Sequence, residues 1–141
     1  MNFWDSSSIL PLLVREDNSR TVRALLAEMP EMAIWWGTSV ECVSALARKE
    51  REGHLSLEQF AVAQQNLATV EDNAVCIDPS LRVRRVAHKL LRRYPLRAAD
   101  SLQLAAACVL AGEFTMEYGF VCNDERLITA ASKEGFSVVT P

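Results

Sequence analysis

The sequence predicts an α/β domain built on a parallel sheet of four or five strands, with more helices than strands. Short apolar runs recur along the 141 residues, and segments long enough to form helices separate them. Strands that alternate with helices are joined by crossovers and lie parallel in one sheet. Because no internal repeat or linker-like stretch divides the sequence, residues 1–141 are predicted to form a single domain.

The first half of the chain is predicted to form two strands and four helices. Pro30, Gly37 and Gly53 separate the elements, since proline and glycine interrupt regular structure. Ser19 and Ser56 precede helical segments at the place where a serine side chain can cap a helix. The predicted order is strand 1–4, helix 6–14, helix 20–29, strand 33–36, helix 38–52 and helix 56–69.

The second half is predicted to form three strands and three helices. Asp78 follows an apolar run and precedes Pro79, and proline is favoured at the first position of a helix, so Asp78 is predicted to cap that helix. Pro95, Gly112 and Gly135 mark the ends of the helices. The predicted order is strand 74–77, helix 79–93, helix 98–111, strand 118–122, helix 125–134 and strand 136–140.

Composition narrows the class of protein. The net charge is -3, from 15 Lys and Arg against 18 Asp and Glu, which does not favour a protein that coats nucleic acid through its overall charge. Four cysteines without a C-x-x-C pair and only two histidines argue against a zinc site. The cysteines stand among apolar residues and are expected to be buried free thiols in a reducing compartment. No leader and no apolar run of membrane-spanning length is present, so we expect a cytoplasmic protein without a membrane partner.

Four carboxylates are the candidate chemical groups. Asp5 and Asp124 each follow a predicted strand, and Glu41 and Asp100 fall in the first turns of predicted helices. Since helices that follow parallel strands begin at one edge of the sheet, these acids are expected to gather there. Two carboxylates about 4 Å apart repel by roughly 4 kcal/mol at an effective dielectric of 20, and a divalent cation such as Mg²⁺ or Mn²⁺ reverses that cost.

Helix capping is the alternative explanation for each acid taken singly. Asp5 and Asp124 can be N-caps, and Asp100 stands where the helix dipole favours an acid. Thr38 to Glu41 matches a capping box, in which Glu41 would bond back to the backbone of Thr38. A functional cluster differs from four separate helix caps only if the fold brings the four side chains together in space.

The acids lie within four segments of the chain: Phe3-Trp4-Asp5-Ser6-Ser7, Glu41 within Thr38–Arg48, Leu96–Ala105 and Val121–Leu127. Together these segments resemble the PIN-domain nucleases, most closely the VapC-type toxins of type II toxin–antitoxin pairs. The likeness covers essentially the whole chain, and its most specific part is Leu96–Ala105. The resemblance implies a PIN-like three-layer sandwich around a central parallel sheet, and a homodimer. It also implies a Mg²⁺- or Mn²⁺-dependent endoribonuclease that hydrolyses RNA phosphodiester bonds and is neutralised by a cognate antitoxin protein.

The same resemblance assigns roles to individual residues. Glu41 would orient the attacking water, and Cys122 departs from the family, many members of which have Thr or Ser at that place. The implied catalytic residues are Asp5, Glu41, Asp100 and Asp124, of which Asp5, Asp100 and Asp124 would hold the metal. Support for the site would come from Ser6, Ser7 and Asn123.

A basic helix precedes Asp100 and is a candidate surface for RNA. Seven of the fifteen cations fall between Arg82 and Arg97, at spacings that place several on one helix face. The opposite face would hold Val83, Val86, Leu90 and Leu91. An ordinary solvated helix face is the alternative explanation. The residues proposed to contact RNA are Arg82, Arg85, Lys89, Arg92 and Arg97.

Two other classes of protein fit the acids less well than the nuclease does. A haloacid-dehalogenase phosphotransferase needs a second Asp at the position of Ser7, and a response-regulator receiver needs a lysine after its last strand, which this chain lacks. A catalytically weak PIN-fold domain that binds protein or RNA stays open as the alternative. Of the aromatic residues, Trp4 and at least one of Trp35 and Trp36 are expected in the core.

Overall fold

The computed structural model describes residues 1–141 and contains one parallel sheet of five strands. The predicted α/β class is therefore confirmed, as is the three-layer arrangement. The sheet order is β3-β2-β1-β4-β5, so the first strand of the chain lies in the middle of the sheet. The strands are β1 (Asn2–Trp4), β2 (Met32–Trp35), β3 (Val75–Ile77), β4 (Gly119–Val121) and β5 (Ser137–Val139).

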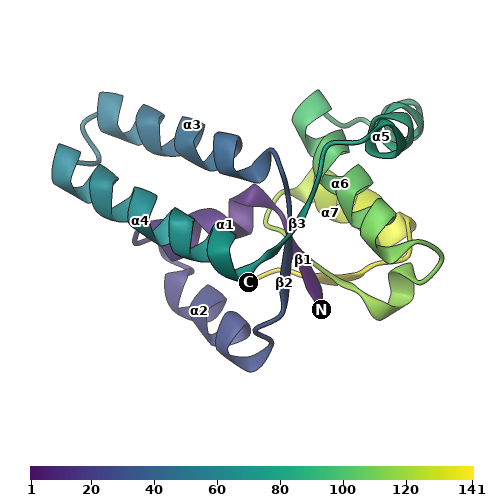
Figure 1. Cartoon of the computed structure of the whole chain (residues 1–141), viewed down its shortest axis with the longest axis horizontal. Coiled ribbons are helices and arrows are strands. Elements are labelled where there is room, and N and C mark those ends of the chain that lie inside the picture. Colours follow the sequence, from purple (N-terminus) through teal and green to yellow (C-terminus); the bar gives the residue numbers. More distant parts are fainter.

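Seven α-helices cover the two faces of the sheet. In Figure 1 the helices α1 to α4 lie to the left of the strands, and α5 to α7 lie to the right. A short 3₁₀ helix over Thr115–Glu117 precedes β4. The helices are α1 (Ser6–Leu13), α2 (Ser19–Glu28), α3 (Thr38–Arg51), α4 (Leu57–Asn73), α5 (Leu81–Arg93), α6 (Ala98–Ala111) and α7 (Glu125–Lys133).

Each central strand serves two hydrophobic cores, because successive side chains point to opposite faces of a sheet. In β1, Phe3 packs into the core under α5, α6 and α7, whereas Trp4 packs into the core under α1 to α4. In β4, Phe120 stacks on Phe3 with ring centroids 5.5 Å apart, and Val121 faces the other core. The sheet is therefore covered on both faces, as expected for parallel strands with helical crossovers.

The start of α5 differs from the prediction. Ser80, and not Asp78, is the N-cap, and its hydroxyl accepts a hydrogen bond from the backbone N–H of Val83 at 3.1 Å. The first helical residue is Leu81, so Pro79 stays in the preceding loop. A cap acts from the residue directly before the helix, and Asp78 lies two residues too early to do so.

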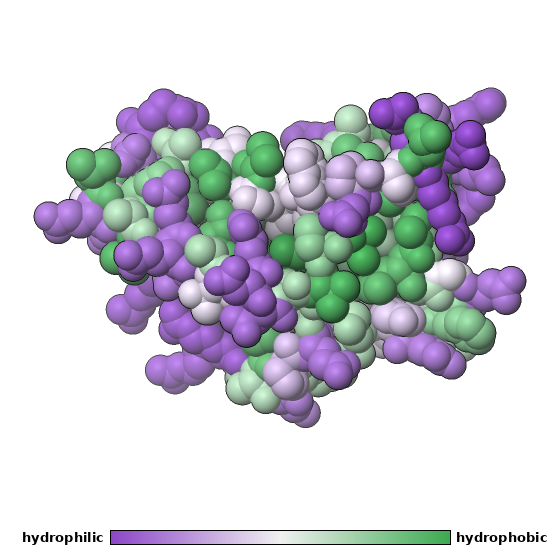
Figure 2. Space-filling model, in the orientation of Figure 1, coloured by the Kyte–Doolittle hydropathy of each residue, from purple (hydrophilic) through white to green (hydrophobic).

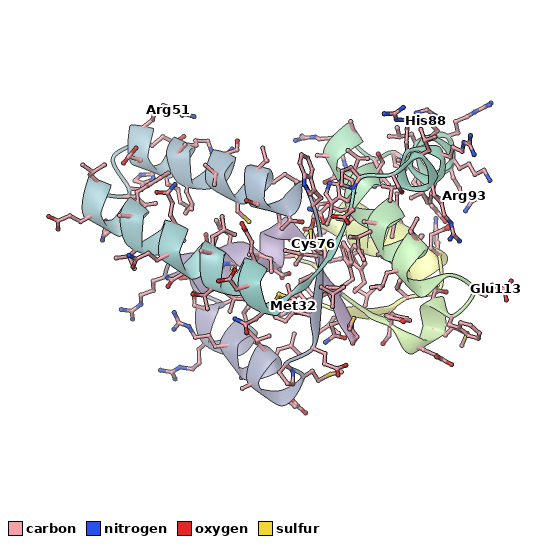
Figure 3. The ribbon with its side chains drawn as sticks, in the orientation of Figure 1. Met32, Arg51, Cys76, His88, Arg93 and Glu113 are labelled. Atoms are coloured by element: carbon pink, nitrogen blue, oxygen red, sulfur yellow. The ribbon has the colours of Figure 1, made fainter.

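The buried stripe of α5 also differs from the prediction. It consists of Val83, Ala87 and Leu90, at spacings of four and three residues, whereas Leu91 is 40% exposed. The basic residues occupy the outer side, and hydrophilic side chains gather over α5 at the upper right of Figure 2. His88 and Arg93 project outward from this helix in Figure 3.

The end of α5 is tied to α7. Arg93 donates two hydrogen bonds from Nη1 to the carboxylate of Glu134, at 2.9 and 2.7 Å, and the Tyr94 hydroxyl donates to the same carboxylate at 2.5 Å. This contact fixes the basic helix relative to the element that follows Asp124.

The other expectations about burial are met in part. Trp4 is fully buried and Trp35 nearly so, while Trp36 is 55% exposed, which confirms that at least one of the pair is in the core. All four cysteines are free, but Cys76 on the edge strand β3 is exposed and Cys108 is only half-buried, so the expectation that all would be buried is met by Cys42 and Cys122 alone. None of the helices combines the length and apolar character that a membrane-spanning segment needs.

Candidate active site

The sheet order explains why distant acids meet. In the sheet, β2 and β3 lie on one side of β1, and β4 and β5 lie on the other side. The order of the strands therefore changes direction between β1 and β4. In an open parallel sheet, ligands usually bind in the crevice at the carboxyl ends of the strands where this change occurs. Asp5 follows β1 and Asp124 follows β4 at this crevice. The backbone N–H of Asp5 donates to the carbonyl of Val121 at 3.0 Å, which joins the ends of the two strands.

The four predicted acids line one cavity of about 350 Å³. A second cavity of about 550 Å³ shares Glu41, Arg97, Asp100 and Asp124 with the first. The structure thus brings together residues from α1, α3, α6 and α7 and from the loops before them. Of the predicted supporting residues, Ser6 and Ser7 line the first cavity and Asn123 lines the second.

Asp5 is the most buried of the acids, with 4% of its surface exposed. Its Oδ2 accepts hydrogen bonds from the backbone N–H of Ser7 at 3.1 Å and from the Ser7 hydroxyl at 2.6 Å. Burial raises the pKa of Asp5 above its usual value, and the bonds from Ser7 oppose that rise. Asp5 also caps α1, so the capping explanation and the functional one both apply to this residue.

Cys122 and Ser7 connect Asp5 to Asp124. The Cys122 thiol lies 3.5 Å from Oδ2 of Asp5 and accepts a hydrogen bond from the backbone N–H of Asp124 at 3.3 Å. The Ser7 hydroxyl accepts from the backbone N–H of Asn123 at 3.1 Å. Burial raises the pKa of Cys122, which keeps it a neutral thiol beside the carboxylates. The position at which the sequence departs from the family therefore lies inside the site.

Glu41 faces the cavity and does not close a capping box. Helix α3 has Gly37 as its N-cap and no side-chain cap, so the capping-box prediction for Thr38 and Glu41 is wrong. Oε1 of Glu41 accepts from the Ser6 hydroxyl at 3.1 Å, and Oε2 accepts from Nε2 of Gln103 at 2.8 Å. Burial raises the pKa of Glu41, and the charge of Asp5 adds to the rise, while the bond from Gln103 opposes it.

Asp100 and Asp124 are the other two acids that line the cavity. Asp100 is half-buried in the first turn of α6, and burial raises its pKa, with a further contribution from the charge of Asp124. Arg97 and Arg126 oppose that rise as nearby positive charges. Asp124 caps α7 through Oδ1, which accepts from the backbone N–H of Leu127 at 3.1 Å.

The donor chemistry of the cavity suits a hard divalent cation. All four candidate groups are carboxylates, and Mg²⁺ and Mn²⁺ prefer oxygen ligands. As the side chains are placed, no three His, Cys, Asp or Glu residues are close enough together to hold one ion. Mg²⁺ is commonly held by one or two carboxylates, with waters and substrate phosphates in the other positions. The residues present therefore fit such an open site and do not form an all-protein cage.

Several residues at the site were not predicted from the sequence. Arg48 lines the first cavity, Arg126 lines the second, and Gln103 contacts Glu41 from inside the protein. Helical spacing could have found two of them. Arg48 is two turns after Glu41 on α3, and Gln103 is one turn after Asp100 on α6, so each shares a face with an acid.

The predicted RNA-contacting residues fall into two groups. Arg97 lines both cavities. The others are exposed on α5 and line neither cavity. These are Arg82, Arg85, Lys89 and Arg92.

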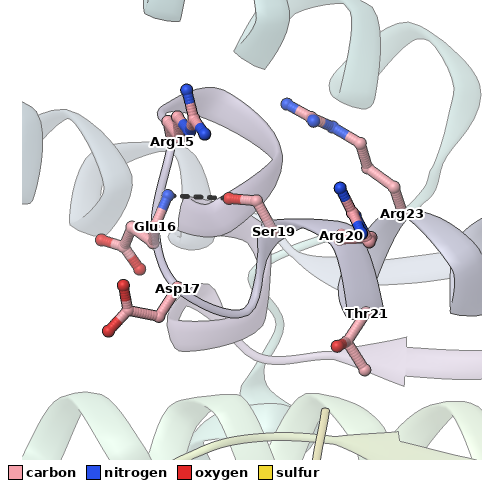
Figure 4. Close-up of a pocket in the computed structure, with 7 residues that line it drawn as sticks. All are labelled: Arg15, Glu16, Asp17, Ser19, Arg20, Thr21 and Arg23. Atoms are coloured by element: carbon pink, nitrogen blue, oxygen red, sulfur yellow. Dashed lines mark hydrogen bonds between the residues drawn. The ribbon is translucent and has the colours of Figure 1, made fainter.

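A larger polar cavity of about 690 Å³ lies elsewhere, at the start of α2. Figure 4 shows its residues, with a hydrogen bond of 2.8 Å from the backbone N–H of Glu16 to the Ser19 hydroxyl. It contains none of the four acids. Its lining residues are Arg15, Glu16, Asp17, Ser19, Arg20, Thr21 and Arg23.

Comparisons with known proteins bear on the fold. No protein-family model and no curated protein matches the chain. A solved toxin–antitoxin complex from Klebsiella pneumoniae matches with a TM-score of 0.68 and 16% identity, over 100% of this chain and 98% of that chain. VapBC2 from Rickettsia felis, solved bound to a promoter DNA fragment, matches with a TM-score of 0.67 and 14% identity, over 99% and 98% of the two chains.

A third similar structure is VapBC-5 from Mycobacterium tuberculosis, described as a member of the VapBC family of toxin–antitoxin systems. It matches with a TM-score of 0.57 and 17% identity, over 99% of this chain and 95% of that chain. The chain has a PIN-like fold. The fold implied by the sequence resemblance is thereby confirmed, and at these identities the matches establish the fold alone.

Proposed function

We propose that this PIN-like protein is a Mg²⁺- or Mn²⁺-dependent endoribonuclease that hydrolyses RNA phosphodiester bonds in the cytoplasm. The observation that carries the proposal is the gathering of Asp5, Glu41, Asp100 and Asp124 around one cavity at the crevice between β1 and β4. Burial and mutual repulsion raise the pKa of three of these acids, so the cluster costs stability unless a cation occupies it.

Each acid has a proposed role that follows from its position in the site. Asp5 and Asp124 stand on rigid strand ends and would hold the metal, together with Asp100. A bound divalent ion would lower the pKa of a water ligand and neutralise the charge that develops on the phosphate. Glu41, held through both oxygens, orients the attacking water and accepts its proton. As the water oxygen bonds to phosphorus, the bond from phosphorus to the leaving sugar oxygen breaks, and solvent protonates that oxygen.

Arginines near the acids supply the contacts for the substrate backbone. Arg97, Arg126 and Arg48 line the acidic cavities, and guanidinium groups bind phosphate oxygens through paired hydrogen bonds. The exposed cations of α5 extend this contact away from the cavity. RNA contact at α5 is supported by the absence of carboxylate partners for Arg82, Arg85, Lys89 and Arg92, none of which forms a salt bridge.

We further propose that the protein acts as the toxin of a toxin–antitoxin pair. Two similar structures, from Klebsiella and Mycobacterium, are described as a toxin–antitoxin complex and as a member of a family of toxin–antitoxin systems, and a third, from Rickettsia, is described as VapBC2. The matches cover 95% to 98% of those chains. The partner would be a small cognate antitoxin protein that blocks the acidic cavity. Co-expression of a neighbouring small reading frame should relieve growth arrest caused by the wild-type chain.

Two matched variants test the nuclease directly. Asp5→Asn and Asp124→Asn remove one charge each but keep a side chain that can cap a helix. Purified with wild type and assayed on single-stranded RNA with Mg²⁺ or Mn²⁺, both should lose about 100-fold or more in rate, because loss of an outer-shell partner alone costs about 10–100-fold and loss of a ligand should cost at least as much. Asp78→Asn is the control, because Asp78 also follows a strand but lies outside the cavities. Wild-type rates for either cavity variant would remove that residue from the mechanism.

A catalytically weak binding domain is the second candidate function. It is favoured by the finding that no three acidic, histidine or cysteine side chains are placed to hold one ion. The two candidates differ in their response to metal. An active-site protein should gain thermal stability with Mn²⁺ and lose most of that gain in Asp5→Asn, whereas a binding domain should show neither effect.

The edge of the sheet suggests where a homodimer would form. Strand β3 has a neighbour on only one side, and the apolar residues Trp36, Val40, Val75 and Leu81 are exposed around it. Apolar side chains occupy the middle of the face in Figure 2, where Figure 3 places Cys76 of β3. We propose a second copy of the chain as the occupant. Val75→Lys should give a monomer by light scattering, while Val62→Lys, at an exposed valine on α4, should not.

A further inference from the structure

A buried polar connection runs from α6 to Glu41. Gln103 is completely buried, and its side-chain Nε2 donates to Oε2 of Glu41 at 2.8 Å and to the Thr38 hydroxyl at 3.0 Å. The Thr38 hydroxyl in turn lies 3.3 Å from Oε1 of Gln103, to which it donates. Thr38 is also fully buried, so water does not compete for these bonds.

The surroundings of Gln103 make an amide costly there. Its neighbours on α6, Leu104, Ala105, Ala106 and Ala107, are all buried in the hydrophobic core. Burying an amide without hydrogen-bond partners destabilises the fold, and a leucine or methionine would fill the same space without that cost. The cost of burying the Gln103 amide is offset only because both of its N–H groups have acceptors, one of which is the carboxylate of Glu41.

Glu41 is consequently held from two sides. Ser6 on α1 binds one carboxylate oxygen and Gln103 on α6 binds the other. A long, flexible glutamate side chain at a cavity rim would otherwise sample several rotamers. With both oxygens engaged, the remaining lone pairs have a fixed direction.

We propose that Gln103 is a positioning residue, which holds the carboxylate of Glu41 by Oε2 for the hydrolytic step. The proposal rests on the proposed ribonuclease function and adds to it a residue that never touches the substrate. An amide N–H can only donate, so it supports the ionised form of Glu41, which is the form that accepts a proton from water. Helix α6 therefore contributes two residues to the site. Asp100 presents a carboxylate to the cavity, and Gln103, one turn later, supports Glu41 from behind it.

The test uses Gln103→Met, which keeps an unbranched side chain of similar length but removes both donors. Cleavage of single-stranded RNA with Mn²⁺ should show kcat lowered about tenfold or more with KM unchanged, in line with the loss of a hydrogen bond to a charged group. The acidic limb of the pH–rate profile should move to higher pH. Ser101→Ala is the control, because Ser101 is a buried polar residue of α6 that bonds only to the carbonyl of Ala98, and its kcat should stay unchanged.

A double-mutant cycle separates positioning from general damage to the fold. In a Glu41→Gln background, Gln103→Met should cause no further loss of kcat, since its partner carboxylate is gone. If Gln103→Met fails to fold by circular dichroism, Gln103→Asn replaces it, because the shorter amide retracts from Glu41 while remaining polar. An equal loss in both backgrounds, or wild-type kcat and pH profile in the single variant, would overturn the proposal. Absence of cleavage by the wild-type protein would instead overturn the ribonuclease function, and this proposal with it.

Discussion

The Asp5→Asn substitution is expected to make the metal-free protein more stable at neutral pH, even though we expect it to abolish the proposed activity. Asp5 is nearly inaccessible to water, and no cationic side chain is bonded to it. Its carboxylate instead accepts two hydrogen bonds from Ser7 and lies near the thiol of Cys122. An asparagine amide keeps the capping contact to Ser7 without burying a charge. The proposed role of Asp5 in the site and the stability of the fold therefore make opposite demands on this position.

The expected gain follows from the local contacts. Burying a lone carboxylate costs several kcal/mol after relaxation, and each hydrogen bond to the charged group returns about 1.5–3 kcal/mol. With two bonds from Ser7, a net penalty of about 1 kcal/mol remains for Asp5. In a chain of 141 residues this corresponds to a rise in Tm of roughly 4 °C for Asp5→Asn.

The dependence of this gain on pH gives a second check. Because the pKa of Asp5 is raised on folding from its ordinary value of 3.8, the folded state binds more protons than the unfolded state between the two pKa values. The penalty is therefore complete at neutral pH and is relieved as the pH falls through the folded pKa. The Tm difference between Asp5→Asn and wild type should be largest near neutrality and shrink toward pH 4.

Thermal unfolding in the presence of a chelator, followed by circular dichroism from pH 4 to pH 7.5, measures both effects. Asp78→Asn serves as the matched control and should change Tm little at any pH, since Asp78 is exposed. A lower Tm for Asp5→Asn at neutral pH, or a gain that does not vary with pH, would refute the account of a buried and uncompensated carboxylate.

Three further predictions concern the metal, the basic helix and the core. Mn²⁺ at about ten times its Kd should stabilise the wild type by about 1.4 kcal/mol, and Asp124→Asn should lower that gain in a differential scanning fluorimetry titration. The slope of log Kobs for single-stranded RNA against log salt concentration is expected near -2, and replacing both Arg85 and Lys89 by glutamine should bring it about 1.4 closer to zero. Arg20→Gln, which changes a residue of α2 and not of the basic helix, should leave the slope unchanged. Phe120→Ala should lower the free energy of unfolding in urea by about 3–5 kcal/mol, because its fully buried ring stacks on Phe3; a loss below about 1 kcal/mol would contradict this packing.

The sequence was sufficient for the architecture because the relevant signals are local. Apolar runs, glycines and prolines located all five strands and seven α-helices, and parallel topology then required the acids after β1 and β4 to share an edge. The errors were also local. At α5 two capping residues, Asp78 and Ser80, stood close together, and the order Asp-Pro suggested the wrong one.

The detail of the site depended on contacts that no local pattern encodes. Thr38 and Glu41 have the spacing of a capping box, but Ser6 and Gln103 are stronger partners for Glu41 and lie 35 and 62 residues away along the chain. Gln103 stands among the apolar residues of a core helix in the sequence. Only the three-dimensional structure shows that its amide has Glu41 as a hydrogen-bond partner. Arg126 was missed because its helix had to be placed before its proximity to Asp100 could be seen, whereas Arg48 lies two turns after Glu41 on the same helix and could have been found from that spacing.

The central place of β1 has a consequence for how the protein is made. The second hydrogen-bonding partner of this strand is β4, so the middle of the sheet closes only through pairing across more than a hundred residues. Such distant contacts slow folding, and an N-terminal fragment that stops before β4 lacks both this partner and Asp124. A nascent chain therefore cannot bring the four acids together until nearly all of it has been translated, so the proposed nuclease would stay inactive until synthesis is almost finished.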